Sequence, residues 1–343
     1  MKKALIAMSG GVDSSAAAYL MRRGGWDCHG VMLWLFGDEE PAAARDARQA
    51  AETLGMSFSL VDGRERFRRE VMDVFAREYM AGRTPNPCIR CNRTIKFGLM
   101  LELLQDFGAD VLATGHYARI EEDGNGAFHL LRAKNRAKDQ SYFLYTISPA
   151  QLARVRFPLG EFADKDAVRA LAETAGLSAA KRKDSQDVCF IPDGDYAAYL
   201  RERGETLLPG DFVDGNGTVL GRHEGLACYT RGQRKGLGVS AASRLYVIEK
   251  DKERNTVRLG EEKELFSSAL LAEELFLSPD APARVSAKTR YSHAEAAATL
   301  TRTEEGLLVR FDEPQRALTP GQAVVFYDGD RVLGGGTIAR YME

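Results

Sequence analysis

The most constraining feature of this 343-residue chain is an apolar run followed by a glycine-rich turn and a helical pattern, all near the N-terminus. Residues 4–7 are apolar, and residues 8–15 read Met-Ser-Gly-Gly-Val-Asp-Ser-Ser. Gly10 and Gly11 let backbone N–H groups approach an anion closely, and the following serines add hydroxyl donors at the positive end of a helix. This order predicts a phosphate-binding loop. No Gly-Lys-Ser/Thr follows, so the loop is not of the P-loop NTPase type.

Strand and helix patterns alternate through the first half of the chain, which predicts an α/β fold class with a doubly wound parallel sheet. We expect strands at 3–8, 28–35, 57–61 and 110–114, and helices at 13–23, 41–54, 65–79 and 95–107. The strand patterns are short and apolar, as in a sheet buried on both faces. Leu33 closes the second strand and Gly115 directly follows the fourth, so both should face the same crevice as the glycine loop.

The second half of the chain is expected to be richer in strands. We expect a hairpin at 117–131 and helices at 149–155, 165–175 and 195–203. Turn sequences then dominate and predict a small β-rich central domain over 203–265. Alternating runs at 296–302, 306–311, 322–327 and 331–335 are typical of an antiparallel barrel or sandwich, and we prefer a C-terminal β-barrel over 266–343. The N-terminal domain would then cover 1–202.

Composition indicates a globular protein without a global sign of nucleic-acid binding, since 44% of residues are hydrophobic, 28% are charged and the net charge is −2. No stretch approaches the ~20 apolar residues of a membrane span. No secretory segment precedes the first strand pattern, so we expect a cytoplasmic protein. Basic residues cluster at 64–69, 132–138, 181–183 and 231–235. They would form a phosphate-binding stripe if they converge on one face, and ordinary solvated surface otherwise.

Two loops with cysteines are candidate reactive sites. The first reads Arg-Thr-Pro-Asn-Pro-Cys-Ile-Arg-Cys-Asn, and its two prolines predict a stiff, non-helical loop. Cys88 and Cys91 have a spacing that suits a redox pair or half of a metal site. We expect Asn92 and Thr94 to cap a helix that begins near residue 95. The dipole of that helix would favour a thiolate placed just before it.

The second cysteine loop, at 181–190, contains Cys189. Three cationic side chains lie six to eight residues before this cysteine and would lower the pKa of its thiol if the loop folds back. Cys28 lies inside a strand pattern, and we interpret it and Cys228 as small buried apolar residues. Cys91 and Cys189 are therefore the candidate functional thiols.

Taken together, these segments resemble the bacterial tRNA-specific 2-thiouridylase family. The glycine loop alone is similar to the pyrophosphate loop of ATP pyrophosphatases, which adenylylate their substrates; its combination with both cysteine loops is specific. The resemblance runs from about residue 4 to the end of the chain. Its motifs are SGGVDSS at 9–15, TPNP at 84–87, CN at 91–92, KF at 96–97, ATGHY at 113–117, KDQSYFL at 138–144, DSQDVCFI at 184–191, TRGQRKGLG at 230–238, RY at 290–291 and PGQA at 320–323.

The resemblance implies ATP-dependent 2-thiolation of the wobble uridine, position 34, of tRNA anticodons. The flipped uridine's C2 oxygen would attack the α-phosphate with Mg²⁺ support, and pyrophosphate would leave. A persulfide on Cys189 would then attack C2 and release AMP. Cys91 would either attack the persulfide to release sulfide or form a disulfide with Cys189. The implied ATP-binding residues are Ala7, Met8, Ser9, Gly10, Gly11, Val12, Asp13 and Ser14, with Leu33 and Gly115 near the adenine, and Asp13 is the third implied catalytic residue.

The resemblance also implies tRNA contacts and partners. The contacts would be made by Asn86, Pro87 and Cys88 at the target base, and by His116, Lys138, Asp139, Gln140, Arg290, Tyr291 and Gln322. For His116 the alternative to a tRNA contact is a strand-end histidine whose hydrogen bonds are satisfied locally. For residues 138–140 the alternative is a solvated turn. The expected partners are the tRNA anticodon stem-loop and a sulfur donor, either sulfide or a cysteine desulfurase relay. No membrane partner is expected, and we expect a monomer.

One departure from the family leaves the sulfur chemistry open. Many members carry Asp where this chain has Cys88. Cys88, Cys91 and Cys189 together would suit a four-iron four-sulfur cluster with one open iron for sulfide. We place the persulfide route first because it needs only two cysteines. Another ATP pyrophosphatase synthetase would need no cysteine pair, a zinc module would need a fourth ligand, and a non-enzymatic RNA-binding protein would not need the glycine loop.

Overall fold

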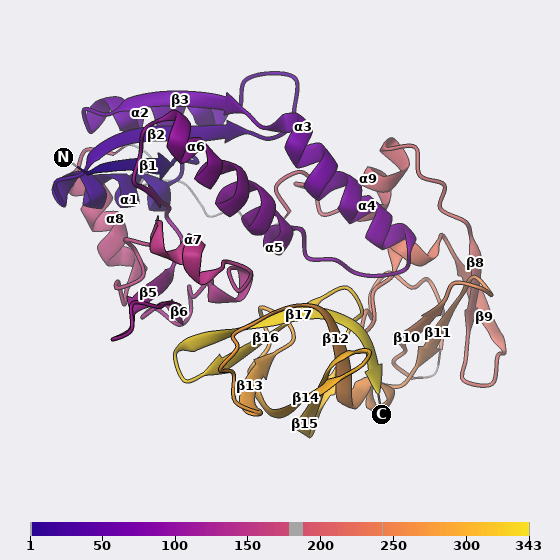
Figure 1. The fold of residues 1–343 in the computed structure, drawn as a ribbon. Helices are drawn as coiled ribbons and strands as arrows, with labels where there is room; N and C mark the ends of the chain where they lie inside the picture. Colours follow the sequence, from indigo (N-terminus) through magenta and orange to yellow (C-terminus); the bar gives the residue numbers. More distant parts are fainter. Residues whose placement is uncertain (1, 178–187, 242, 343) are drawn as a thin grey trace. The chain divides into compact units, whose positions relative to one another are not determined.

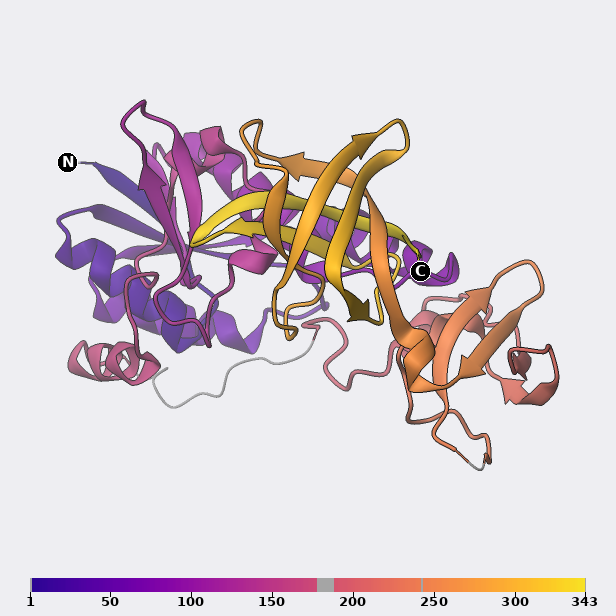
Figure 2. The same ribbon diagram turned by 90° about the horizontal axis from the view of Figure 1, so that it is seen from below.

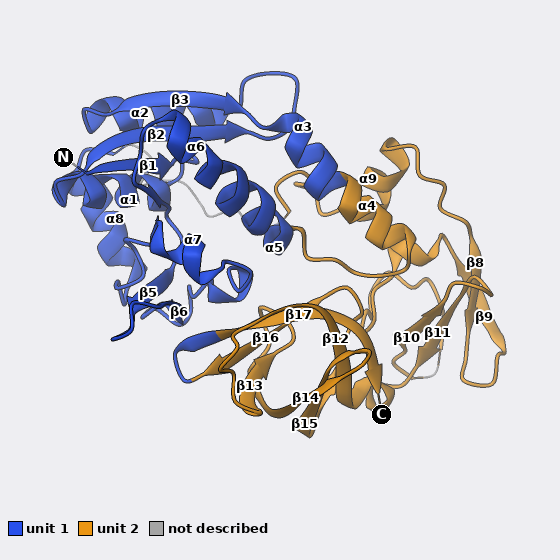
Figure 3. Cartoon of the chain, viewed as in Figure 1, with its two compact units in different colours: residues 1–72, 88–186, 329–332 blue, residues 73–87, 187–328, 333–343 orange. Residues whose placement is uncertain are grey.

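The computed structural model of the chain describes residues 2–177, 188–241 and 243–342, so the segments 181–183 and 184–187 named above lie outside the described residues. The chain forms two compact units (Figure 3). Unit 1 comprises Met1–Met72, Cys88–Gln186 and Gly329–Val332, and unit 2 comprises Asp73–Pro87, Asp187–Asp328 and Leu333–Glu343.

Unit 1 is built on a five-stranded parallel sheet in the order β3-β2-β1-β4-β7. Strands β3, β2 and β1 are labelled in Figure 1. The strands are β1 (Lys3–Ala7), β2 (Asp27–Trp34), β3 (Ser57–Asp62), β4 (Val111–Ala113) and β7 (Val155–Arg156). The first four confirm the predicted doubly wound sheet. The fifth was predicted as the end of a helix, because a two-residue strand shows no periodicity. The order of the strands reverses between β1 and β4, and in such sheets ligands bind at the carboxyl ends of the strands at this point.

Some of the helices of unit 1 pack against this sheet, and its core follows from the alternation of side chains along the strands. The helices of unit 1 are α1 (Val12–Arg23), α2 (Ala42–Thr53), α3 (Arg64–Phe67), α5 (Pro87–Cys91), α6 (Met100–Asp106), α7 (Pro149–Ala153) and α8 (Lys165–Thr174). Ile6 of β1 packs in one cluster with Ala18 of α1 and Ala47 of α2. The adjacent Leu5 is also fully buried and, by alternation, faces the other side of the sheet.

The prediction of a non-helical loop around Cys88 and Cys91 is wrong from Pro87 onward, where α5 begins. The helix expected near residue 95 begins at Pro87 and continues through a π-helical segment, Asn92–Leu99, into α6. A proline is well tolerated at the first helical position, because its φ is already helical and its missing N–H has no partner there. Asn92 therefore caps nothing. Its side-chain amide donates to the Phe143 carbonyl oxygen (3.0 Å).

Two further predictions of helical structure need adjustment. Thr94 lies inside the π-helical segment, where its hydroxyl donates to the Arg90 carbonyl oxygen (3.1 Å), so it is not a cap. The helix predicted at 65–79 is α3, a π-helical turn Arg68–Met72 and α4 (Asp73–Met80) in succession. The predicted hairpin is confirmed as β5 (Ala118–Glu122) and β6 (Phe128–Arg132).

Unit 2 contains a closed antiparallel barrel, which confirms the preferred β-barrel over a sandwich (Figure 2). The strand order is β12-β15-β14-β13-β16-β17, and pairing of β12 with β17 closes it. The strands are β12 (Phe266–Leu277), β13 (Arg284–Lys288), β14 (Ala296–Thr303), β15 (Gly306–Arg316), β16 (Ala323–Asp328) and β17 (Arg331–Met342). Leu270, Val309 and Phe326 are central members of its core.

The rest of unit 2 includes a small sheet and the helices α4 and α9. The sheet has the order β10-β11-β8-β9 and consists of β8 (Gly210–Val213), β9 (Val219–His223), β10 (Tyr246–Asp251) and β11 (Thr256–Gly260). Helix α9 (Tyr196–Glu202) contributes to an aromatic cluster with Phe75 and Tyr79 of α4. No helix in the described part of the chain is long and apolar enough to cross a membrane.

Candidate active site

The glycine loop after β1 is a tightly built turn. Gly10 has φ +73°, and a Cβ at this position would lie 2.5 Å from the Ala43 carbonyl oxygen, so only glycine fits. The Ser14 hydroxyl accepts a hydrogen bond from the Ser9 N–H (3.1 Å) and donates to the Gly11 carbonyl oxygen (3.0 Å). Gly11 is the N-cap of α1. The N–H groups of the first turn of α1 have no intrahelical acceptor, so the loop offers donors to an anion.

Gly115, which follows β4, lies directly against the start of α1. A Cβ on Gly115 would lie 2.7 Å from the Asp13 carbonyl carbon and 2.8 Å from the Ser14 nitrogen. Real Cβ atoms do not approach backbone atoms this closely, so the contact depends on glycine. The structure thus brings together two predicted ATP-binding segments that are about 100 residues apart. Leu33 lies on β2, where it pairs with Val61 of β3.

The Asp13 carboxylate contacts two donors that the sequence did not reveal. The Tyr117 hydroxyl donates to Oδ1 (2.9 Å), and the Lys165 ammonium lies 3.5 Å from Oδ2. Lys165 is buried, so its charge is held close to the carboxylate. Tyr117 belongs to the motif at 113–117, but Lys165 carries no sequence signal, because only tertiary packing places the first residue of α8 beside α1. The arrangement gives Oδ1 a hydrogen bond and places a buried cation beside Oδ2, which offsets the charge of Asp13.

Cys88 and Cys91 lie one turn apart on α5. The positive charge of Lys96 affects the pKa values of Cys88 and of His116. Cys88 is exposed, whereas Cys91 is buried. Although Cys88 is exposed, protein atoms packed around its thiol desolvate the thiolate and raise its pKa, while Lys96 lowers it. Burial of the imidazole lowers the pKa of His116 well below its usual range, and the nearby positive charge of Lys96 lowers it further. His116 is therefore a neutral imidazole at physiological pH, with Nδ1 2.8 Å from the Thr114 hydroxyl.

The predicted tRNA-contact segment at 138–140 contains two side chains that shape the local loop. Asp139 is buried and accepts hydrogen bonds from the Ala133 N–H (2.9 Å) and the Ser141 hydroxyl (2.8 Å). The Gln140 side-chain oxygen accepts from the Tyr117 N–H (2.9 Å). These contacts link the segment to the residue that holds Asp13. Lys138 is half-buried.

In unit 2, Cys189 is exposed and lies beside an anchored aromatic residue. The next residue, Phe190, packs edge-to-face on Phe75 of α4, with ring centroids 5.4 Å apart. Tyr199 of α9 contacts the same two rings. The backbone at Cys189 is thus fixed on one side by hydrophobic packing. An exposed thiol on such a support is accessible to reactants from solvent.

The remaining predicted tRNA-contact residues of unit 2 lie near the barrel. The Gln322 amide donates to the Thr84 carbonyl oxygen (2.8 Å), and the Thr84 N–H donates to the Pro320 carbonyl oxygen (2.9 Å). These two hydrogen bonds fix the backbone at Thr84. That backbone leads to Asn86 and to Pro87, and Pro87 is the first residue of α5. The Arg290 guanidinium donates to the Thr319 hydroxyl (2.7 Å) and to the Arg231 and Ala317 carbonyl oxygens, and Tyr291 is 39% exposed.

No group of three or more His, Cys, Asp or Glu side chains within residues 2–177, 188–241 and 243–342 is arranged to hold a metal ion. Cys88 and Cys91 on one helical turn provide two thiols of such a set. Asp13, the acidic residue of the glycine loop, already has a donor at each carboxylate oxygen. We therefore assign no metal ligands in this part of the chain.

Comparison with known proteins covers the whole architecture. Residues 2–193 match the family described as tRNA methyl transferase HUP domain, 197–261 the tRNA methyl transferase PRC-barrel domain, and 269–338 the aminomethyltransferase beta-barrel domain. The tRNA-specific 2-thiouridylase MnmA of Geobacter metallireducens is 46% identical over 98% of this chain and 96% of its own length. The enzymes of the same name from Pelobacter propionicus (47%; 98% and 97%) and Lachnoclostridium phytofermentans (42%; 99% and 100%) are similarly close. The chain belongs to the tRNA-specific 2-thiouridylase family.

Proposed function

We propose that this chain catalyses ATP-dependent 2-thiolation of the uridine at position 34 of tRNA. The observation that carries this proposal is the contact of Gly115 with the first peptide of α1, at the point where the sheet reverses. It joins the glycine loop to the motif at 113–117 in one crevice, as an adenylylating enzyme requires. Membership of a family whose named relatives are tRNA-specific 2-thiouridylases supplies the substrate.

In the proposed first step, the C2 oxygen of the uridine attacks the α-phosphate of ATP and pyrophosphate leaves. The N–H groups of the glycine loop and of the first turn of α1 hold the phosphates. Asp13 carries a negative charge close to them, and Lys165 with Tyr117 offsets that charge. Mg²⁺, bound with the nucleotide, would neutralise the leaving pyrophosphate.

In the proposed second step, the terminal sulfur of a persulfide on Cys189 attacks C2, and AMP leaves. The Cys91 thiolate then attacks the Cys189 sulfur, which breaks the S–S bond, releases 2-thiouridine and leaves a Cys91–Cys189 disulfide for reduction by an external thiol. In the alternative order, Cys91 attacks the persulfide first and frees sulfide as the nucleophile. The exposure of Cys189 favours its loading by a donor such as a cysteine desulfurase relay.

An iron–sulfur route is the second candidate, because Cys88 and Cys91 lie one turn apart on α5. There Cys88, Cys91 and Cys189 would hold a four-iron four-sulfur cluster whose open iron binds sulfide, and Cys189 would carry no persulfide. The two routes differ in their need for iron. They also differ at Cys88, which the persulfide route does not use for sulfur transfer.

The test is a thiolation assay on unmodified tRNA with ATP, Mg²⁺ and a sulfur source. It compares aerobically purified, iron-free enzyme with enzyme reconstituted anaerobically with iron and sulfide. For the persulfide route we expect activity in the iron-free sample. Cys91→Ser and Cys189→Ser should each lower 2-thiouridine formation more than 100-fold, on the order expected for loss of a covalent catalyst, while pyrophosphate release persists. Activity only after reconstitution, together with loss in Cys88→Ser, would establish the cluster, and no 2-thiouridine in either sample would overturn the proposal.

A further inference from the structure

The segment 84–87, which ends at the first residue of α5, is held at its start by a turn of the barrel. This turn, residues 317–322, joins β15 to β16 and lies in unit 2 together with the segment. The N–H of buried Thr84 donates to the Pro320 carbonyl oxygen (2.9 Å), and the Thr84 carbonyl oxygen accepts from the Gln322 amide (2.8 Å). The two prolines of the segment have no N–H to donate, so its backbone has few donors of its own.

The β15–β16 turn approaches Thr84 this closely because Gly321 has no side chain. Gly321 has φ +91°, and a Cβ on it would lie 2.8 Å from the Thr84 nitrogen and 3.0 Å from the Arg83 Cβ. Any other residue would push the turn and the segment apart, and it would also strain the backbone of the turn. The close approach brings the next residue, Gln322, within hydrogen-bond distance of the segment.

Two side chains attach the same stretch of chain to other parts of unit 2. The Arg83 guanidinium forms an ion pair with Glu273 of β12 (2.7 Å). The Thr84 hydroxyl lies 3.4 Å from the Thr230 hydroxyl, within hydrogen-bond distance. The backbone at Thr84 therefore has a fixed position within unit 2, set by contacts from three separate stretches of the chain.

The turn that carries Gln322 is itself anchored in the barrel. The Gln322 N–H donates to the Thr319 carbonyl oxygen (3.1 Å), and the Gln322 carbonyl oxygen accepts from the Ile338 N–H (2.7 Å). Ile338 is fully buried in the core of the barrel. The Arg290 guanidinium donates to the Thr319 hydroxyl (2.7 Å). Because both backbone groups of Gln322 are bonded, its side chain reaches Thr84 from a fixed base.

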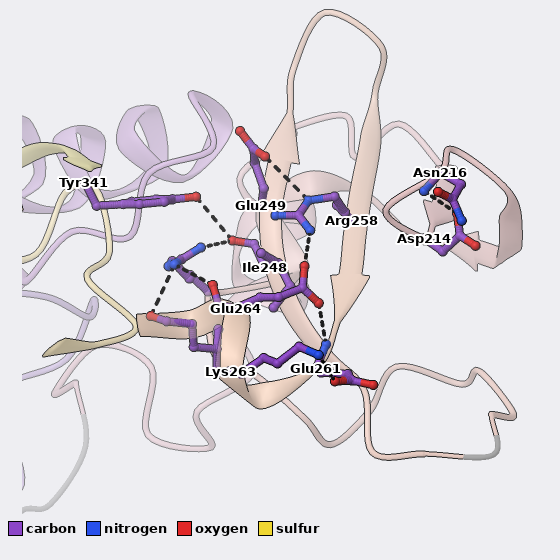
Figure 4. Close-up of polar contacts among 11 residues, drawn as sticks. Asp214, Asn216, Ile248, Glu249, Arg258, Glu261, Lys263, Glu264 and Tyr341 are labelled. Atoms are coloured by element: carbon purple, nitrogen blue, oxygen red, sulfur yellow. Dashed lines mark hydrogen bonds and ion pairs between the residues drawn. The ribbon is translucent and has the colours of Figure 1, made fainter. Parts of the chain in front are cut away.

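Arg290 connects this turn to a polar network that joins the barrel and the small sheet. Its guanidinium also donates to the Arg231 carbonyl oxygen (3.2 Å). Arg231 is buried, and its own guanidinium donates to the Ile248 carbonyl oxygen on β10. Figure 4 shows the Tyr341 hydroxyl directed at the same Ile248 carbonyl, at 3.4 Å. The contacts of Arg290 thus support the turn that holds the segment.

We propose that Gln322 is a positioning residue, which fixes the segment 84–87 so that Asn86 and Pro87 meet the target uridine in the reactive position. The inference rests on the proposed function for the role of Asn86 and Pro87. It assigns Gln322 to a contact within the protein, in place of the direct RNA contact expected from the sequence. Because reaction rates respond to misplacement by about 1 Å, loss of this bond should slow the reaction more than it weakens tRNA binding.

The first test follows the segment without any RNA, by hydrogen exchange of the full chain. The variant is Gln322→Met, which keeps the length of the side chain and removes the donor. Loss of one typical hydrogen bond should make the Thr84 amide hydrogen exchange about fivefold faster than in the wild type. The matched control is Gln315→Met, which removes a bond of the same kind, from the Gln315 amide to the Glu313 carbonyl oxygen (2.8 Å) on β15. Its Thr84 exchange should equal that of the wild type.

The second test is the thiolation assay at varied tRNA concentration and saturating ATP. For Gln322→Met we expect kcat to fall about tenfold, while the KM for tRNA changes by less than about twofold. Gly321→Ala should lower kcat at least as much, because its Cβ displaces the Thr84 backbone. Gly217→Ala is the control for left-handed strain, since Gly217 has φ +83° and a Cβ there would meet no atom within 4 Å. This control should keep the kcat of the wild type.

Three results would overturn the inference. The first is Thr84 exchange that is unchanged in Gln322→Met. The second is a raised KM for tRNA with unchanged kcat, which would assign Gln322 to a direct RNA contact. The third is an equal fall of kcat in Gln315→Met or Gly217→Ala, which would indicate general damage to unit 2. If the wild type forms no 2-thiouridine, the proposed function fails, and the exchange experiment still decides whether Gln322 fixes the segment.

Discussion

At the scale of single residues, Asp13 places a negative charge at the proposed phosphate site, and Lys165 and Tyr117 contact that carboxylate. Removal of the cation in Lys165→Met leaves this carboxylate uncompensated beside the loop that would hold ATP. We expect a KM for ATP raised about tenfold, because one uncompensated charge near phosphates is worth roughly 1–2 kcal/mol at an effective surface dielectric, with a smaller effect on kcat. Steady-state pyrophosphate release at varied ATP measures both.

Tyr117→Phe is the matched control for this prediction, since it removes one hydrogen bond to Asp13 and no charge. Its KM for ATP should rise about fivefold or less, in line with the ~1 kcal/mol or less that a typical hydrogen bond contributes. A KM effect in Tyr117→Phe as large as that in Lys165→Met would show that the geometry of Asp13, and not its charge, limits nucleotide binding.

Lys250 is a second residue whose environment has a measurable consequence. Desolvation lowers the pKa of this lysine from 10.5 to about 8, while its ammonium donates to the Tyr229 carbonyl oxygen (2.8 Å). Between these two pH values the unfolded chain binds the proton and the folded chain does not. The free energy of unfolding therefore rises with pH across this window and falls as pH drops through it.

We expect the difference in unfolding free energy between the wild type and Lys250→Met to increase by roughly 2–3 kcal/mol from pH 8 to 10.5, because one pKa unit corresponds to ~1.4 kcal/mol. Below pH 8 the difference should stay constant. Urea unfolding of both proteins over this pH range measures it. A difference that is flat through the window would mean that Lys250 titrates alike in the folded and unfolded chains.

At the scale of secondary-structure elements, the contact between the end of β4 and the first turn of α1 controls the candidate site. Gly115→Ala would place a Cβ 2.7–2.9 Å from backbone atoms of Asp13 and Ser14, so one of the two elements must move. We expect ATP-dependent pyrophosphate release to fall at least tenfold, since misplacement by about 1 Å has effects of this size or larger. Gly124→Ala, in the open turn of the β5–β6 hairpin, should leave the activity unchanged.

The elements also show what the sequence can and cannot predict. The strands around the glycine loop were predictable, because short apolar runs and turn glycines are local signals. The start of α5 was not, because the rule that proline breaks helices does not apply at the first helical position, where Pro87 lies. The contacts of Lys165 and Gln322 could not be predicted from the sequence, for another reason. Their partners, Asp13 and Thr84, are more than 100 residues away, and only tertiary packing joins them.

At the scale of the whole molecule, unit 2 combines the small sheet and the barrel into one compact body, and buried Arg231 links them. Its guanidinium donates to the carbonyl oxygens of Ile248 on β10 and of Leu265 just before β12. It also stacks 3.7 Å from the ring centroid of Tyr341 on β17. A planar group with several fixed donors can make these contacts together, whereas an ammonium cannot.

Arg231→Lys should therefore lower the free energy of unfolding of unit 2 by about 2–4 kcal/mol, because it leaves buried carbonyl oxygens without donors. It should also weaken the coupling between the two parts, so that calorimetry shows the unit 2 transition splitting into separate small-sheet and barrel transitions. Arg222→Lys is the control, since Arg222 makes an exposed ion pair worth at most ~1 kcal/mol. If Arg231→Lys unfolds in the same single transition with only the small shift seen in Arg222→Lys, the barrel and the small sheet are joined by their hydrophobic contacts, and Arg231 is dispensable for their cooperativity.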